Sequence, residues 1–222
     1  ICAAVRAGFP ANKIVFAGVG KADWEINLGL DNDIFCFNVE SAVELEIINE
    51  LAATKNKVAS IALRINPEVD AHTHAKITTG MKENKFGINL SQLGGVLDKL
   101  KEMKNVKLIG IHSHIGSQIT DMSSFRNLVI RFNEIQEELE AHGVTVENLN
   151  FGGGLGIDYY HPNHLSIPAF DNYFAAIHKL LQVRPGQQVH FEPGRSIVAQ
   201  CGTLISKVLY VKEGETKKFA IL

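Results

Sequence analysis

The sequence predicts an α/β protein, a parallel TIM-like (β/α)8 barrel of which about six strands are present, followed by the start of a β-rich domain. Strand-like and helix-like stretches alternate six times along the chain, which favours a parallel sheet with right-handed crossovers. Glycine and polar residues follow several successive strands, whereas an open doubly wound sheet concentrates its site at one switch point. The 222 residues, 45% of them hydrophobic, suffice for one sizeable core.

Each predicted strand is an apolar run that a turn residue ends. We expect strands at 13–18, 33–40, 58–66, 106–114, 149–151 and 189–192. If these belong to an eight-stranded barrel, two further strands lie upstream of Ile1, and the last two runs are strands 7 and 8, where barrels commonly bind phosphate.

Helices are expected between these strands. Ser41 with Glu44 forms a capping box for a helix that runs to about residue 55, and Ser91 is expected to cap the next helix. The clearest helix has apolar residues at alternating spacings of three and four, namely Phe125, Leu128, Phe132, Ile135 and Leu139. Weaker helical patterns cover 1–7, 21–30 and 167–181.

The pattern changes near the end of the chain. Two strand-like runs, 204–211 and 219–222, follow each other without a helix between them, which indicates a hairpin. We therefore expect residues 1–200 to form the barrel and 201–222 to begin a β-rich domain. The chain opens without an initiator methionine and closes on an apolar run, so we expect it to be a piece of a longer protein.

Charge and cysteine content bear on partners and compartment. The 22 lysine and arginine residues and 24 aspartate and glutamate residues give a formal net charge of −2 without a basic stripe, which argues against nucleic acid and membrane surfaces as partners. No apolar run is long enough to cross a bilayer. Cys2, Cys36 and Cys201 are few and far apart, so we expect no disulfide framework and a cytoplasmic location.

Three strand ends carry the candidate site. An apolar run stops at Pro193-Gly194, which sets Glu192 and Arg195 at the mouth of the barrel, for chemistry or as one surface ion pair. Gly152, Gly153 and Gly154 follow another strand, and consecutive backbone N–H groups without side chains suit a phosphate. The run lacks the lysine and serine or threonine of a nucleotide P-loop, so a triphosphate is not implied.

The third strand end carries His112 and His114, which share one face of a strand. Gly116 and Ser117 follow at once, so His114 is the better candidate for the site. This pair, with His72 and His74, also suits a metal-dependent hydrolase, but only Glu192 adds a ligand at a comparable strand end, so we expect no metal.

Two further charged residues leave alternatives open. Arg64 faces opposite to its apolar strand neighbours and is either an inward charge near the mouth or an edge residue in solvent. Lys85 lies in a long loop, 68–87, and is expected at the surface or at an interface rather than in catalysis.

These motifs resemble those of the diaminopimelate decarboxylase family, pyridoxal-phosphate enzymes with an alanine-racemase-like barrel. The resemblance runs over essentially the whole chain and in the family's order, through the stretches that begin at Arg64, Thr79, His112, Phe151 and Phe191. It implies that the cofactor phosphate lies on Gly152 to Gly154, Ser117, Gly194 and Arg195, and that Pro193 is also among the cofactor-binding residues. It also implies that Glu192 faces the pyridine nitrogen, that His114 stacks on the ring, and that Arg195 approaches a substrate carboxylate.

The resemblance also implies residues that the chain lacks. The family's Schiff-base lysine lies on an early strand that nothing in this sequence matches, and its proton-donating cysteine reaches across a homodimer interface from a downstream segment. We therefore expect the parent protein to decarboxylate meso-diaminopimelate, and this segment alone to be inactive. The alternatives are ornithine, arginine or a carboxylated polyamine as substrate, a barrel that binds the cofactor without turnover, and the metal hydrolase.

Overall fold

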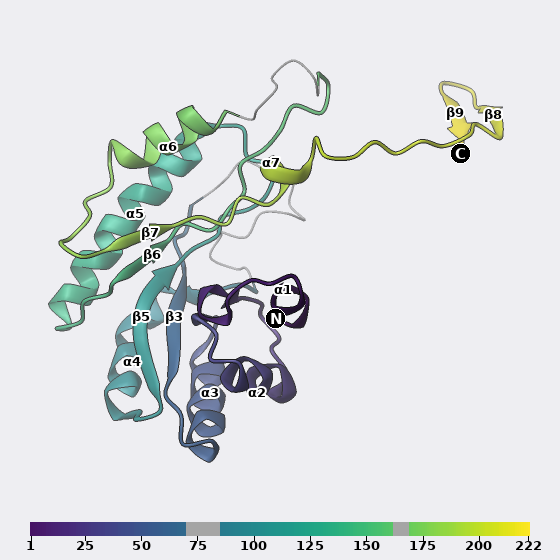
Figure 1. Ribbon diagram of the computed structural model, residues 1–222. Helices are drawn as coiled ribbons and strands as arrows, with labels where there is room; N and C mark the ends of the chain where they lie inside the picture. The colour runs from purple at the N-terminus through teal and green to yellow at the C-terminus, as the bar shows by residue number, and fades with distance from the viewer. Residues whose placement is uncertain (70–84, 162–168) are drawn as a thin grey trace.

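The chain folds into a curled parallel sheet covered by helices, which forms a half-barrel (Figure 1). The structure is a computed structural model that describes residues 1–69, 85–161 and 169–222. Six strands lie in the order β1-β2-β3-β5-β6-β7, and β4 pairs with β3. All these pairs are parallel, which confirms the predicted barrel architecture. The strands are β1 (Val15–Phe16), β2 (Cys36–Val39), β3 (Ala59–Asn66), β4 (Ile88–Asn89), β5 (Val106–His112), β6 (Asn148–Asn150) and β7 (Gln188–His190).

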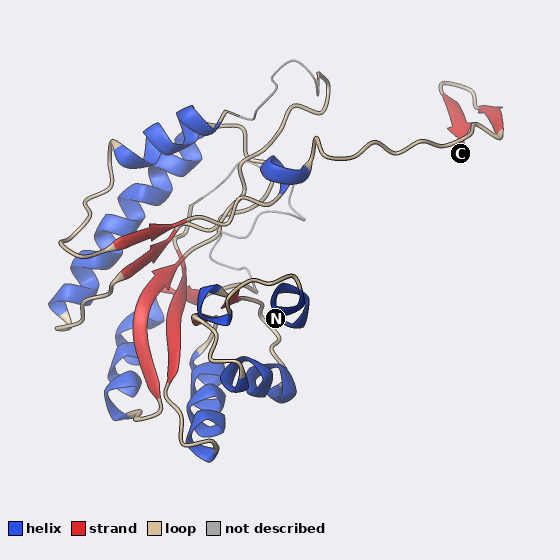
Figure 2. Ribbon diagram, in the orientation of Figure 1, coloured by secondary structure: helices blue, strands red, loops and turns tan. Residues whose placement is uncertain are grey.

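The helices lie outside the curled sheet, as Figure 2 shows in blue against the red strands. In the described parts of the chain, no helix has the length and apolar character needed to cross a membrane. The predicted helix at 167–181 begins later, and residues 167 and 168 lie outside the described residues. The helices are α1 (Cys2–Arg6), a short 3-10 helix (Ala11–Lys13), α2 (Asp23–Asp31), α3 (Ala42–Thr54), α4 (Leu90–Glu102), α5 (Met122–Ala141), α6 (Phe170–His178) and α7 (Arg195–Val198).

The two faces of the sheet differ in chemistry because side chains alternate along each strand. Val39, Leu63 and Leu149 are buried with the helices in the main apolar core. The other face, inside the half-barrel, carries polar residues. Arg64 pairs with His112 in the strand register, and His112 pairs with Asn150, so the three lie at one level near the carboxyl ends of the strands.

The predicted start of α3 is correct, but its capping box is only half formed. The Ser41 hydroxyl accepts a hydrogen bond from the Glu44 N–H at 3.1 Å. The Glu44 carboxylate does not return to Ser41; it accepts from the Glu40 N–H at 2.8 Å and from the buried Lys21 ammonium at 2.5 Å. A buried ammonium requires a charged acceptor, which explains the difference.

The predicted cap of α4 is wrong. Asn89, not Ser91, is the N-cap residue, and its N–H donates to the Gln92 side chain at 3.4 Å. Asparagine caps helices as well as serine does, so the sequence offered two candidates. One face of α4 is apolar, and its Leu93 and Leu97 are buried in the core.

The C-terminal segment leaves the half-barrel. After α7 the chain is extended, and it ends in an antiparallel hairpin of β8 (Tyr210–Glu213) and β9 (Lys218–Ile221), which stands apart from the sheet in Figure 1. The predicted hairpin is confirmed, although its first strand begins at Tyr210 rather than at Leu204.

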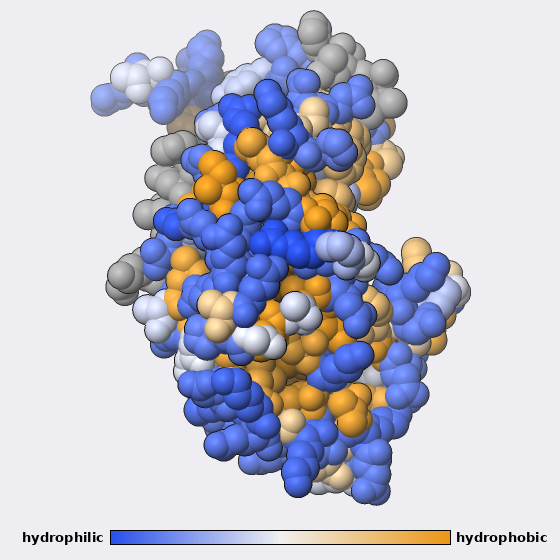
Figure 3. Space-filling model, turned by 90° about the vertical axis from the view of Figure 1, so that its left-hand side faces the viewer, coloured by the Kyte–Doolittle hydropathy of each residue, from blue (hydrophilic) through white to orange (hydrophobic). Residues whose placement is uncertain are grey.

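Apolar groups also reach the surface of the half-barrel. Figure 3, which views the side where α5 and α6 lie, shows hydrophobic patches between hydrophilic ones. A groove of about 280 Å³ between α6 and β7 is lined by Phe174, Ile177, Val189 and Phe191, among others. β7 has no neighbour on its outer side within the described residues, so this groove borders an open edge of the sheet.

Candidate active site

The carboxyl ends of β6 and β7 are held together by the glycine run. The Glu192 N–H donates to the Gly152 carbonyl oxygen at 2.8 Å. A Cβ atom built on Gly153 would lie 2.1 Å from the Glu192 carbonyl oxygen. Glu192 and Gly153, which the sequence places 39 positions apart, are therefore neighbours at one end of the sheet.

Each glycine of the run is needed for close backbone approach. A Cβ atom on Gly152 would lie 2.5 Å from the Ser113 carbonyl oxygen, and one on Gly154 would lie 2.4 Å from the Gly116 carbonyl oxygen. Both glycines also have positive φ, +63° and +104°, which side chains disfavour. The run thus joins the ends of three strands.

The backbone donors of this run are not all free, in contrast to the exposed nest that we predicted. The Gly152 N–H donates to the Asn150 side-chain oxygen at 2.9 Å, and the Gly153 N–H donates to His114 Nδ1 at 3.2 Å. Within the described residues the Gly154 N–H has no acceptor. The turn therefore offers an incoming anion one ready N–H, with the other two engaged in holding side chains.

Arg195 and Ser117 add donors beside this N–H. The Arg195 guanidinium donates to the Ser117 hydroxyl at 3.3 Å and to the Tyr159 hydroxyl. Arg195 is exposed, and a Cβ atom on Gly194 would meet nothing within 4 Å. Sequence reasoning missed Tyr159, whose one signal was its place in the loop after the glycines.

Glu192 does not form the surface ion pair with Arg195 that one interpretation of the sequence allowed. Its Oε1 accepts a hydrogen bond from Asn150 Nδ2 at 2.8 Å, and His112 Nε2 lies 3.6 Å from the same oxygen. His112 is buried, and no hydrogen bond reaches either of its ring nitrogens in the described residues. Burial, followed by the charge of Arg64, lowers the pKa of His112 well below 6.5, so this imidazole is neutral.

His114 is neutral as well. Burial, and then the Arg64 charge, lowers its pKa to about 4. Because Nδ1 accepts from the Gly153 N–H, the ring proton lies on Nε2. A flat neutral ring therefore stands beside the glycine run.

Two cations lie inside the half-barrel with their own counter-charges. Arg64 is the inward charge rather than the edge residue, and it pairs with Glu40 at 2.7 Å where both side chains are buried. Lys21 is fully buried and donates to the Gly18 and Asn38 carbonyl oxygens and to Glu44. All three donors of this ammonium are used, so Lys21 acts in the structure of the sheet.

The remaining candidates lie outside this site. Lys85 is exposed, as expected for a surface residue. His72, His74 and the stretch at Thr79 lie outside the described residues. In the described ranges, no three or more histidine, cysteine, aspartate or glutamate side chains form a group that could hold a metal ion.

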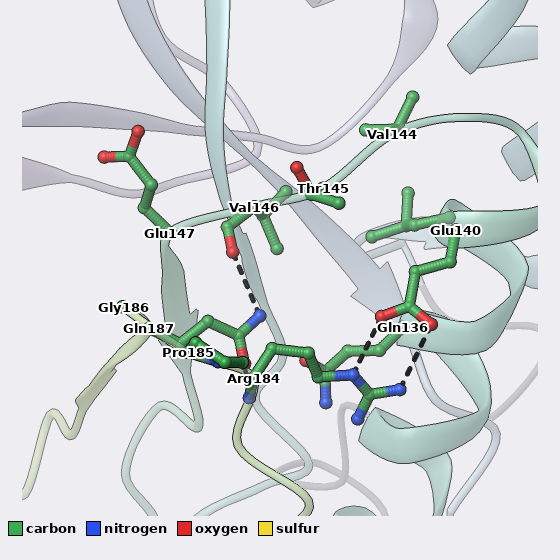
Figure 4. A pocket seen from close by; sticks show the side chains of 11 residues that line it. Gln136, Glu140, Val144, Thr145, Val146, Glu147, Arg184, Pro185, Gly186 and Gln187 are labelled. Carbon is green, nitrogen blue, oxygen red and sulfur yellow. Dashed lines mark hydrogen bonds and ion pairs between the residues drawn. The ribbon is translucent and has the colours of Figure 1, made fainter.

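A cavity of about 370 Å³ lies at the opposite ends of the strands, before β6 and β7 (Figure 4). Two polar side chains that line it already have partners. The Arg184 guanidinium donates a hydrogen bond to Glu140 at 2.8 Å, and Gln187 donates to the Val146 carbonyl oxygen at 3.0 Å. Barrel enzymes place their chemistry at the carboxyl ends of the strands, so the cluster around Glu192 remains the candidate site.

Comparison with known proteins agrees with this fold. The chain is 66% identical over its whole length to a diaminopimelate decarboxylase of Bacteroides thetaiotaomicron and 42% identical over 219 residues to that of Haemophilus influenzae. The structure of Helicobacter pylori diaminopimelate decarboxylase complexed with L-lysine superposes with a TM-score of 0.87 at 38% identity, covering 98% of this chain and 54% of that one. The chain spans 58% and 52% of the two curated relatives.

A family profile matches the chain as well. It describes the pyridoxal-binding domain of pyridoxal-dependent decarboxylases and covers residues 1–199, which include the half-barrel and α7. The chain therefore belongs to the family of pyridoxal-dependent decarboxylases, and its residues 1–199 match their pyridoxal-binding domain.

Proposed function

We propose that this chain is the cofactor-binding part of an enzyme that decarboxylates meso-diaminopimelate to L-lysine and CO2. The family supplies the cofactor, pyridoxal phosphate. The substrate is supported by the names of the relatives and by the L-lysine bound in the Helicobacter pylori structure. The observation that carries the proposal is the convergence of one carboxylate, one neutral imidazole and a set of anion donors at the same strand ends.

The donor set fits the phosphate of the cofactor. The Ser117 hydroxyl, the Arg195 guanidinium and the Gly154 N–H lie on the strand ends that the glycine run joins. We assign the phosphate to Gly154, Ser117, Gly194 and Arg195, and assign Gly152, Gly153 and Pro193 to the cofactor-binding turns that carry these donors. A guanidinium with hydroxyl and amide donors suits a dianion, because charge-assisted hydrogen bonds are stronger than neutral ones.

The ring of the cofactor is assigned to Glu192 and His114. Pyridoxal phosphate, when bound, accepts the electron pair that the departing CO2 leaves on the substrate. Glu192 holds the proton on the pyridine nitrogen, since a carboxylate beside it favours the charged form. The neutral His114 ring stacks against the cofactor without adding a positive charge.

Arg195 has a second role toward the substrate. Its guanidinium is a planar fork that can hold a carboxylate by two hydrogen bonds, and it already stands at the exposed rim with Tyr159. In the substrate complex it approaches a substrate carboxylate while its other N–H groups remain toward Ser117.

The arrangement of the whole protein is part of the proposal. Residues 1–200 form the barrel domain and 201–222 begin a β-rich domain, which is supported by the hairpin of β8 and β9. The Schiff-base lysine and the proton-donating cysteine lie outside this chain, the second in the partner of a homodimer. Sparse cysteines support a cytoplasmic location.

The test is made on the full-length protein that contains this chain. We expect the purified protein to show the visible absorption of bound pyridoxal phosphate and to release CO2 from meso-diaminopimelate. A panel with ornithine, arginine and a carboxylated polyamine decides the substrate. Bound cofactor without turnover of any of them would indicate a barrel that binds without catalysis, and a colourless protein that contains metal would indicate the hydrolase.

A further inference from the structure

Asn150 connects the two parts of the proposed site. It is the last residue of β6, and only 6% of its surface is exposed. Its Oδ1 accepts from the Gly152 N–H at 2.9 Å, and its Nδ2 donates to Glu192 Oε1 at 2.8 Å. One amide therefore spans the distance between the glycine run and the proposed ring acid.

The orientation of this amide is determined by its surroundings. A backbone N–H is always a donor, so the Gly152 N–H requires the oxygen of the amide. The NH2 group must then point to Glu192. The Glu192 oxygen that it reaches, Oε1, is therefore the acceptor of this hydrogen bond.

The second oxygen of Glu192 is left for another partner. Oε2 makes no hydrogen bond within the described residues. His112 adds little to the hold on Oε1, because its ring is neutral and lies 3.6 Å away. The Asn150 amide is thus the group that fixes the rotation of the Glu192 carboxylate.

We propose that Asn150 is a positioning residue, which turns Glu192 so that Oε2 faces the pyridine nitrogen and accepts its proton. The inference rests on the proposed role of Glu192. Because Asn150 also accepts a hydrogen bond from the Gly152 N–H, it fixes the position of Glu192 relative to the glycine run. Cofactor ring and cofactor phosphate are then held at a fixed separation by one side chain.

The test compares two asparagines of the same strand in the full-length protein. Asn150→Leu is expected to weaken retention of pyridoxal phosphate about tenfold, since a hydrogen bond to a charged group is lost. The visible absorption of the bound cofactor should also become more sensitive to alkaline pH than in the wild type, because the ring nitrogen loses its proton more readily. Both quantities are read without turnover, by equilibrium dialysis and by absorbance titration.

Asn148→Leu is the matched control. Asn148 lies one layer deeper on the same face of β6, where it donates to the Ile109 carbonyl oxygen at 2.9 Å and contacts His190 Nε2 at 2.8 Å. Its replacement removes an equally buried amide that touches neither Gly152 nor Glu192. We expect a comparable loss of stability, with the cofactor spectrum and its pH dependence as in the wild type.

Asn150→Asp keeps the test open if the leucine variant does not fold. This substitution keeps the shape of the side chain and preserves the acceptor for the Gly152 N–H. It sets a second carboxylate against Glu192, and two such groups share one proton. We expect wild-type cofactor retention at acid pH and a loss as the pH rises. Asn150 variants whose cofactor titration matches that of Asn148→Leu would overturn the inference, whereas a wild type without bound cofactor would overturn the proposed function itself.

Discussion

Glu192 and Arg195 lie three positions apart, but their hydrogen-bonding environments differ and suit them to different roles. Glu192 faces an amide donor from β6 and a buried neutral imidazole, an environment that supports one acceptor oxygen. Arg195 faces two hydroxyl groups at the rim, which leaves guanidinium donors open to an anion. The first is suited to the electronics of a bound ring, and the second to holding phosphate and carboxylate.

This division predicts different losses for two substitutions. In Glu192→Gln the amide oxygen still accepts from Asn150, so an NH2 group faces the pyridine nitrogen and cannot take its proton. We expect kcat of the full-length protein to fall about 100-fold with less than a tenfold change in cofactor retention. Arg195→Ala should weaken cofactor binding and raise the KM for substrate. Equal losses of turnover and cofactor retention in the Glu192 variant would contradict this division between ring electronics and anion binding.

At the residue scale, the sequence pointed to candidate residues where a motif is contiguous. Glu192, Arg195 and the glycine run were found because each follows a strand that ends in turn residues. Asn150 and Glu40 were missed. Asn150 bonds to Glu192 and Glu40 pairs with Arg64, and each partner comes from a different strand segment of the sheet. Such cross-strand pairs depend on register, which the sequence pattern does not specify to one residue.

The glycine run is the decisive element, because its turn brings three strand ends within backbone contact. Sequence analysis assigned these glycines to a phosphate nest, whereas their tightest constraint is packing. Gly153 has no positive φ, and its constraint is the 2.1 Å approach of a built Cβ to the Glu192 carbonyl oxygen. A backbone oxygen cannot move aside as the end of a side chain can, so the strand ends must separate.

Gly153→Ala is therefore expected to lower cofactor retention at least tenfold and to destabilise the full-length protein by about 1–3 kcal/mol. The control is Gly95→Ala in the middle of α4, where a Cβ would meet nothing within 4 Å. That change should leave cofactor binding unchanged and raise stability by up to about 1 kcal/mol through helix propensity. Cofactor retention measured by dialysis and thermal unfolding of both variants check this, and a Gly153 variant with wild-type retention would refute it.

Elements with long periodic patterns were predicted best. The α5 pattern from Phe125 to Leu139 is buried residue by residue, because that stripe packs into the main apolar core. Short elements were missed or displaced: β4 has two residues and α7 has four, too few for a period to appear. Their formation depends on neighbours such as β3 and on the turn at Gly194.

At the scale of the whole molecule, the inside of the half-barrel is polar and holds buried charge. Arg64 and Glu40 neutralise each other there, and the two histidines beside them remain uncharged. The sequence indicated an inward face through strand alternation, but the protonation of that face depends on how the strands curl around it. Burial and the positive charge of Arg64 together lower the pKa of His112 and of His114.

Those histidines predict how stability depends on pH. Both have a pKa in the folded state below 6.5, about 4 for His114, so the unfolded chain binds protons more readily. The contribution of these two histidines to the free energy of unfolding is therefore fully favourable above pH 6.5, and it falls as the pH drops below that value. Between pH 7.5 and pH 5.5 we expect a loss of roughly 1 kcal/mol for each histidine, measured by urea unfolding of the full-length protein without cofactor.

The contributions can be separated by substitution. His114→Phe should remove about half of this pH dependence, because one of the two groups no longer takes up a proton on unfolding. His161, whose side chain is 75% exposed, is the control, and His161→Gln should leave the profile of stability against pH unchanged. A wild-type protein equally stable at both pH values would mean that the interior accepts the protons, and the neutral imidazole assigned to His114 would then be wrong.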